Sequence, residues 1–287
     1  MIPMKTALVT GGSAGIGKET VRKLVSFGYQ VLIAARDEHK GQALVDSLKA
    51  SQPAAAVRFL SVDLSDFDQV RKCCADIRAA YTHFDLLVLN AGLFTPRLRT
   101  NGSGYECMFA TTHLGHFLLT HELMPLLALG SDRRIVVTSS VAHKLGGRID
   151  FEALRQPSSS TALLLAPFRG YGRSKLANIL FVRELARRYD PAYLKANAFH
   201  PGAIRSEIWR STPSLFNRVV DPFLLSTEQG ARTQIYLATS PELTRSGEYW
   251  VDLKPEPGNR ASRDPELAAA LWRYSEQALG IREFGSP

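Results

Sequence analysis

The chain alternates between short, continuous apolar runs and longer amphipathic segments. The apolar runs cover residues 7–10, 30–34, 57–62, 86–89, 135–138, 196–199 and 249–251. Continuous hydrophobicity is typical of strands buried on both faces, as in a parallel sheet. The segments between them include helical patterns at residues 16–27, closed by Gly28, and 37–48, opened by the N-cap candidate Asp37. The pattern predicts an α/β fold with a doubly wound parallel sheet and helices on both faces.

Two segments depart from this rhythm, residues 144–168 and residues 203–226. Long irregular segments in a compact domain usually carry function. The second is rich in bulky apolar residues, so we expect a substrate lid at 203–226, with Trp209 and Phe216 touching the substrate. The role of 144–168 stays open.

Hydrophobic content, net charge and cysteine spacing limit the kinds of protein that this chain can be. The 287 residues are 45% hydrophobic and no flexible linker divides them, so we expect a single domain over residues 1–287. The net charge is +8, but the basic residues are scattered, and we expect no nucleic-acid partner. Cys73, Cys74 and Cys107 have neither metal-site nor disulfide-framework spacing, so no metal is expected. The N-terminus resembles no signal peptide or membrane span, which predicts a cytoplasmic protein without a membrane partner.

A glycine-rich turn follows the first apolar run. It reads Thr10-Gly-Gly-Ser-Ala-Gly-Ile-Gly17 and opens a helix. Such a turn lets a pyrophosphate approach the free N–H groups at a helix N-terminus. We therefore expect a dinucleotide to contact a set of residues in this turn, namely Gly11, Ser13, Ala14, Gly15 and Ile16.

The end of the second run carries Arg36 at the position that discriminates between cofactors. An acidic residue there binds a ribose 2′-hydroxyl, whereas an arginine accommodates a 2′-phosphate. Arg36 therefore predicts NADP(H), although a solvated surface arginine is the alternative reading.

Together with these motifs, further short motifs resemble the short-chain dehydrogenase/reductase family, which has a Rossmann fold. They are Asp63-Leu64, Asn90-Ala91-Gly92, Ser139-Ser140, Tyr171-Gly-Arg-Ser-Lys175 and Pro201-Gly202. Within the family the chain is most similar to the retinol dehydrogenase-like group, through His-Leu-Gly-His-Phe at 113–117 and Ser-Val-Ala-His at 140–143. The resemblance implies a cofactor site that also includes Asp63, Leu64, Asn90, Ala91, Gly92, Tyr171, Lys175, Pro201, Gly202, Ile204 and Ser206.

Three side chains carry the predicted chemistry. Tyr171 and Lys175 are four residues apart and share a helix face, where a nearby ammonium favours the tyrosinate form. Tyr171 would then exchange a proton with a carbonyl oxygen that Ser140 also hydrogen-bonds. Ser139 and Ser140 face opposite ways at a strand end, and motif alignment favours Ser140. The resemblance implies that Lys175 also holds the nicotinamide ribose.

One position departs from the family, because Thr112 stands where relatives carry the asparagine of a catalytic tetrad. Its main-chain carbonyl remains, and we expect its hydroxyl to bond back to a carbonyl one turn earlier and bend the helix. His113 and His116 are expected to be structural. His143 is a candidate for substrate contact.

These features predict an NADP(H)-dependent oxidoreductase that transfers a hydride between nicotinamide and a carbonyl or alcohol of an apolar small molecule. A non-catalytic NADP(H)-binding sensor or interaction protein on the same fold is the alternative. Reduction of a carbon–carbon double bond is a third, which Ser140 disfavours. In the family the helices around Thr112 and Tyr171 form the usual dimer surface, so a homodimer is possible unless residues 144–168 cover it.

Overall fold

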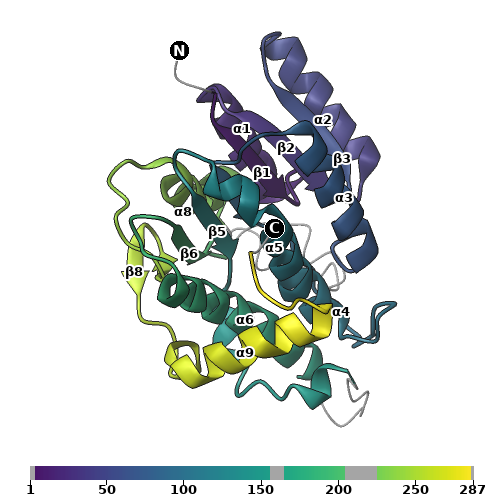
Figure 1. Ribbon diagram of the computed structural model, residues 1–287, viewed down its shortest axis with the longest axis vertical. Coiled ribbons are helices and arrows are strands. Elements are labelled where there is room, and N and C mark those ends of the chain that lie inside the picture. Colours follow the sequence, from purple (N-terminus) through teal and green to yellow (C-terminus); the bar gives the residue numbers. More distant parts are fainter. Residues whose placement is uncertain (1–3, 156–164, 204–224, 286–287) are drawn as a thin grey trace.

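The computed structural model describes residues 4–155, 165–203 and 225–285. The described residues form one eight-stranded sheet in the order β3-β2-β1-β4-β5-β6-β7-β8 (Figure 1). Neighbouring strands run parallel from β3 to β7, and β8 pairs with β7 antiparallel. The strand order reverses between β1 and β4, which is the point where a doubly wound sheet binds its ligand.

The predicted α/β doubly wound fold is confirmed, and most of its strands begin or end within one residue of the predicted runs. The strands are β1 Thr6–Thr10, β2 Gln30–Ala35, β3 Val57–Ser61, β4 Leu86–Leu89, β5 Arg134–Thr138, β6 Lys195–His200, β7 Tyr249–Val251 and β8 Lys254–Glu256. The α-helices are α1 Gly15–Ser26, α2 Glu38–Ser51, α3 Phe67–Ala80, α4 Cys107–Phe109, α5 Gly115–Ala128, α6 Ala166–Arg188, α8 Thr227–Thr239 and α9 Pro265–Leu279. A π-helical turn, Ala110–Leu114, joins α4 to α5, and short 3₁₀ turns lie at Val141–Leu145, Glu152–Leu154 and Ala261–Arg263.

The strand side chains divide between two cores. Leu8, Leu87 and Ile135 point to one face, which α3, α5, α6 and α9 cover. Val9 and Val88 point to the other face, which α1, α2 and α8 cover. Burial on both faces explains the continuous hydrophobicity of the central strands.

Local signals explain several boundaries. The side chain of Asp37 accepts a hydrogen bond from the Lys40 amide and begins α2, as predicted. Gly28 has φ +80° after the last turn of α1, a conformation that suits glycine. The sheet is not wholly parallel, however. The prediction missed β8, because its Lys-Pro-Glu sequence is exposed and has no apolar run.

The C-terminal helix α9 lies along α6, in yellow at the lower edge of Figure 1. Trp272 of α9 packs against Phe117 of α5 and Phe181 of α6, with ring centroids 5.0 and 5.9 Å apart. Phe284, beyond α9, adds to the same cluster. The C-terminal part of the chain therefore covers one face of α5 and α6.

Within the described residues, no helix combines the length and apolar character needed to cross a membrane. The expected lid at 203–226 lies almost wholly outside the described residues, and so do Ile204, Ser206, Trp209 and Phe216. Pro201 and Gly202 directly follow β6.

Candidate active site

The glycine turn lies at the carboxyl end of β1, beside β4. Gly11 and Gly15 have positive φ values of 63° and 56°. A Cβ on Gly11 would lie 3.0 Å from the Ala91 Cα, whereas a Cβ on Gly15 would meet nothing within 4 Å. Helix α1 begins at Gly15 without a side-chain cap, so its first N–H groups remain for a ligand. Ile16 is buried beneath the turn. These features fit the pyrophosphate of a dinucleotide.

The side chains of Asn90 and Thr10 fix this turn through hydrogen bonds to the main chain. The Asn90 side-chain amide donates to the carbonyls of Thr10 at 3.0 Å and Gly11 at 3.3 Å. In return the Thr10 hydroxyl accepts from the amides of Asn90 and Ala91, at 2.9 and 3.0 Å. Asn90 therefore fastens β4 to the glycine turn.

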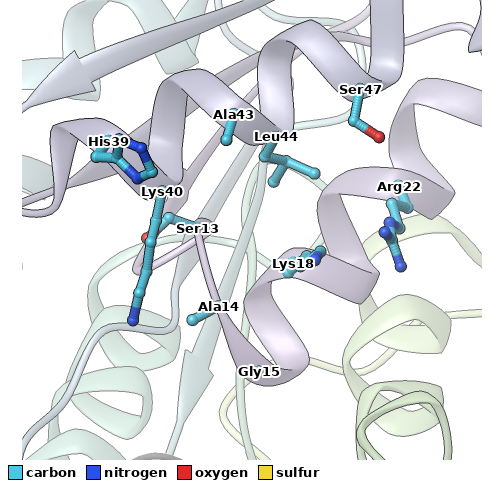
Figure 2. A pocket seen from close by; sticks show the side chains of 10 residues that line it. All are labelled: Ser13, Ala14, Gly15, Lys18, Arg22, His39, Lys40, Ala43, Leu44 and Ser47. Carbon is cyan, nitrogen blue, oxygen red and sulfur yellow. The ribbon is translucent and has the colours of Figure 1, made fainter. Parts of the chain in front are cut away.

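A pocket of about 430 Å³ opens from this turn between α1 and α2 (Figure 2). Its described lining is Ser13, Ala14, Gly15, Lys18, Arg22, His39, Lys40, Ala43, Leu44 and Ser47. None of these ten residues is acidic. His39 and Lys40 were missed from the sequence, although both lie within the first turn of α2, three and four residues after Arg36. A lining of this charge suits an anion.

Arg36 itself lies at the end of β2, with its guanidinium Nη1 3.7 Å from the Asp63 carboxylate. The arginine side chain is exposed, and an exposed pair of this kind contributes little free energy. The guanidinium can therefore exchange this partner for a phosphate. Leu64, next to Asp63, packs against Gly115 at the start of α5, where an added Cβ would lie 2.2 Å from the Leu64 carbonyl oxygen.

Tyr171 and Lys175 of α6 face the end of β5 and are buried. The Lys175 Nζ donates to the Thr138 carbonyl at 3.0 Å and lies 5.5 Å from the centre of the Tyr171 ring. The expected lowering of the tyrosine pKa is wrong for this structure, because burial raises the pKa of Tyr171 to about 12. Burial also lowers the pKa of Lys175 to about 7, which weakens its effect as a cation.

Ser139 and Ser140 lie on opposite sides of the chain beyond β5. The Ser139 hydroxyl donates to the Lys175 carbonyl at 2.8 Å, which ties the strand end to α6. Ser140 is half-buried and hydrogen-bonds the Tyr171 side chain, an interaction that favours the tyrosinate but is outweighed by burial. Ser140, Tyr171 and Lys175 thus meet in one place.

Thr112 lies at the centre of the π-helical turn. Its hydroxyl is buried and has no hydrogen-bond partner among the described residues, so the expected bond to a carbonyl one turn earlier is absent. The π turn itself interrupts the helix. A Cβ on Gly92 would lie 3.2 Å from the Lys175 Nζ and 3.7 Å from the Thr112 Oγ1, so both groups border the same spot. The Thr112 carbonyl accepts from His116 Nδ1 at 2.9 Å.

The buried histidines His113 and His116 each hydrogen-bond a hydroxyl group of the protein. His116 Nε2 lies 2.8 Å from the Thr10 hydroxyl, and His113 Nε2 lies 2.9 Å from the Ser275 hydroxyl. Burial lowers the pKa of His113 to about 3 and of His116 to about 4. Both are neutral structural groups at pH 7. No group of three candidate ligands that could hold a metal occurs in the described part of the chain.

His143 is fully buried, and both of its ring nitrogens have partners in the protein. The described geometry thus gives no support to the expected substrate contact. The Tyr171 ring itself has an apolar neighbour. Phe94 meets the Tyr171 ring edge-on at 5.9 Å and lies 5.2 Å from Phe168. Neither phenylalanine was singled out from the sequence. The residues around Phe94, after the Asn-Ala-Gly motif, carry no pattern of their own, and Phe168 ends the segment 144–168 whose role stayed open.

The class of protein follows from comparison as well as from geometry. Residues 5–149 match the family model for short chain dehydrogenase. Retinol dehydrogenase 12 from Mus musculus is 37% identical over 284 residues, which cover 98% of this chain and 88% of that protein. Retinol dehydrogenase 14 from Homo sapiens is 35% identical, with coverage of 96% and 87%. The chain belongs to the short-chain dehydrogenase/reductase family, whose members are oxidoreductases.

Solved structures agree on the fold. An uncharacterized protein from Mycobacterium paratuberculosis superposes with a TM-score of 0.74 and is 33% identical, with 96% of this chain and 93% of that chain covered. A short chain dehydrogenase from Shigella flexneri, complexed with NADP, gives a TM-score of 0.69 at 21% identity, with coverage of 87% and 97%.

Proposed function

We propose that this oxidoreductase uses NADP(H) and transfers a hydride between the nicotinamide and a carbonyl or alcohol carbon of an apolar small molecule. The meeting of Ser140, Tyr171 and Lys175 at the end of β5 carries the proposal. Bound NADPH would supply the hydride. The residues of the chain would bind the carbonyl oxygen and manage its proton.

The hydroxyl groups of Ser140 and Tyr171 lie within hydrogen-bond distance of each other. A carbonyl oxygen placed between them would replace this mutual bond and accept from both hydroxyls. A phenol with its pKa at about 12 is protonated at neutral pH, which is the form that reduction requires of a proton donor. Ser140 would stabilise negative charge that develops on the oxygen. Lys175, with a pKa of about 7, can hold or release a proton at neutral pH beside Thr112.

The preference for NADP(H) over NAD(H) rests on charge. The pocket between α1 and α2 contains Lys18, Arg22 and Lys40 without an acidic lining residue, and Arg36 lies at the end of the neighbouring strand. A 2′-phosphate on the adenosine ribose is the dianionic group that such a site would select. The Shigella flexneri protein was solved with NADP, and a related Escherichia coli protein with NADPH, on the same fold.

The substrate is proposed to be apolar because Phe94 packs against both Tyr171 and Phe168, and because Val141 and Leu145 are exposed on the turn after Ser140. Such a wall would select by shape with few polar contacts. All three cysteines are free, which fits a reducing compartment such as the cytoplasm.

The test is a screen of aldehydes, ketones and alcohols with both cofactors, followed by nicotinamide absorbance, with the Tyr171→Phe protein as the matched control. Turnover that requires Tyr171 would support the proposal. NADPH binding without turnover of any compound would instead support the non-catalytic sensor, and turnover confined to carbon–carbon double bonds would overturn the carbonyl assignment.

A further inference from the structure

A single buried histidine connects the serine turn to the C-terminal part of the chain. His143 Nδ1 donates to the main-chain carbonyl of Ser140 at 2.7 Å, and the His143 amide donates to the same carbonyl at 3.0 Å. On the other side of the ring, Nε2 accepts from the main-chain amide of Asn259 at 3.2 Å. The imidazole therefore links the serine turn to Asn259, which lies 116 residues beyond His143 in the sequence.

The two partners determine the protonation state of His143. A carbonyl oxygen can only accept, so Nδ1 must carry the proton, and an amide N–H can only donate, so Nε2 must be bare. A second proton on Nε2 would place two donors against each other. Burial, together with Lys144 and Arg183, lowers the pKa of His143, although the Ser140 carbonyl acts in the opposite direction. The ring also packs against Tyr249 of β7, with centroids 5.0 Å apart.

The C-terminal partner is itself held firmly. The Asn259 side chain accepts from the Ser262 amide at 2.9 Å, and the Ser262 hydroxyl donates to the Asn259 carbonyl at 2.8 Å. Arg183 of α6 donates to the carbonyls of Pro257 and Ser262, at 2.9 and 2.5 Å. Residues 257–262 thus form a braced loop, which we call the anchoring loop, between α6 and His143.

We propose that His143 and the anchoring loop position the hydroxyl of Ser140, so that the C-terminal part of the chain sets the geometry of the serine that binds the substrate oxygen. This inference rests on the proposed function. His143 is a positioning residue in this account, because it acts through the Ser140 main chain and touches no reacting atom. The Ser140 carbonyl is fixed from one side by His143, while its hydroxyl meets Tyr171.

Two substitutions of His143 each keep one of the two hydrogen bonds of its ring and remove the other. His143→Asn places an amide nitrogen near the Nδ1 position and keeps the donor to Ser140, whereas His143→Gln places an amide oxygen near the Nε2 position and keeps the acceptor for Asn259. Ser262→Ala loosens the anchoring loop without changing His143. Ser275→Ala is the matched control, because it removes another buried bond from the C-terminal part to a histidine, His113, away from the serine turn.

Steady-state kinetics and amide hydrogen exchange over residues 139–146 would be measured on all four variants. We expect kcat to fall roughly 10- to 100-fold in both His143 variants, as a small misplacement of a binding group does, with KM for NADPH unchanged. Exchange at 139–146 should accelerate in these variants and in Ser262→Ala. Ser275→Ala should lower thermal stability and leave both kcat and this exchange unchanged.

The outcomes distinguish a failure of the proposed function from a failure of the positioning role proposed for His143 and the anchoring loop. If the unmodified protein turns over no carbonyl or alcohol, the proposed function fails, and the exchange measurement alone then decides whether the anchoring loop holds the serine turn. Unchanged exchange in Ser262→Ala and His143→Asn would overturn the inference. A full kcat in both His143 variants would also overturn it, as would losses in kcat that merely follow stability and appear equally in Ser275→Ala.

Discussion

The Lys175 side-chain nitrogen lies 5.5 Å from the centre of the Tyr171 ring. Burial raises the pKa of Tyr171 and lowers the pKa of Lys175, so it favours the uncharged form of both groups. An exposed pair at this spacing would favour an ammonium and a tyrosinate. Here desolvation dominates, so at neutral pH the tyrosine keeps its proton and the lysine is close to its midpoint. These protonation states are the ones that the proposed carbonyl reduction requires, with Tyr171 as the proton donor and Lys175 as a second group that can exchange a proton.

Tyr171→Phe should remove the donor while leaving the shape of the site almost unchanged. We expect kcat for carbonyl reduction to fall by roughly 10²-fold or more, on the usual scale of general acid catalysis. The dissociation constant for NADPH, measured by fluorescence titration, should change little, because the glycine turn and the α1–α2 pocket are untouched. Full activity in this variant would show that either the reaction or the site is wrongly assigned.

Cofactor choice should follow the positive charge around the end of β2. The unmodified protein should prefer NADPH to NADH in kcat/KM, and Arg36→Asp should abolish or reverse the preference. Lys40→Glu should weaken it as well, because Lys40 lines the pocket. Lys49→Glu, an equal charge change at an exposed position near the end of α2, is the control and should leave the ratio unaltered. Equal efficiency with both cofactors in the unmodified protein would contradict this assignment.

Acid should destabilise the fold through its buried histidines. The pKa is lowered from 6.5 to about 3 for His113 and to about 4 for His116 and His200. Because the unfolded chain binds these protons first, their contribution to stability is complete above pH 6.5 and is lost as the pH falls toward about 4. Each histidine adds a slope of up to about 1.4 kcal/mol per pH unit in that window. Urea denaturation at pH 7 and at about pH 5 would measure it, and an unfolding free energy that does not fall would contradict it.

Sequence alone predicted the fold well where a local pattern and the tertiary structure agree. The central strands are buried on both faces and therefore carry continuous apolar runs, and Asp37 caps α2 through a bond that spans only three residues. The glycine turn is predictable for the same reason, since Gly11 needs a positive φ and a close approach to Ala91.

What the sequence did not reveal depends on contacts between distant segments. The pKa of Tyr171 is set by burial that many elements create together. The Thr112 hydroxyl, which has no hydrogen-bond partner among the described residues, lies in a π turn that the hydrophobic pattern of the sequence does not predict. His143 suggested a substrate contact because of its place beside Ser140, but its actual partner, Asn259, is remote in sequence. The cationic pocket required α1 and α2 to be placed side by side before Lys18 and Lys40 could be associated.

The oligomeric state should reflect the C-terminal helix. In the family the helices around Thr112 and Tyr171 usually form the dimer surface, but here α9 packs along α6, and Trp272 reaches Phe117 of α5. We therefore expect a monomer of 31.7 kDa by light scattering across the concentration range used for kinetics. A stable dimer in this concentration range would contradict the expectation.

Thr112 gives the sharpest test of whether the site works without the family's asparagine. Its main-chain carbonyl accepts from His116 Nδ1, and a π turn interrupts the helix at this position. The Thr112 hydroxyl is buried and has no hydrogen-bond partner among the described residues, and both it and the Lys175 Nζ border the space beside Gly92.

We therefore expect turnover in the unmodified protein and in Thr112→Asn, and a modest loss of kcat in Thr112→Val, which keeps the shape and removes the hydroxyl. Because that hydroxyl bonds to no described protein group, Thr112→Val should cost little stability, so a fall in kcat with an unchanged thermal midpoint would report on proton transfer rather than folding. An inactive parent that Thr112→Asn rescues would instead show that threonine at this position prevents turnover, and the unmodified protein would then be a non-catalytic cofactor binder.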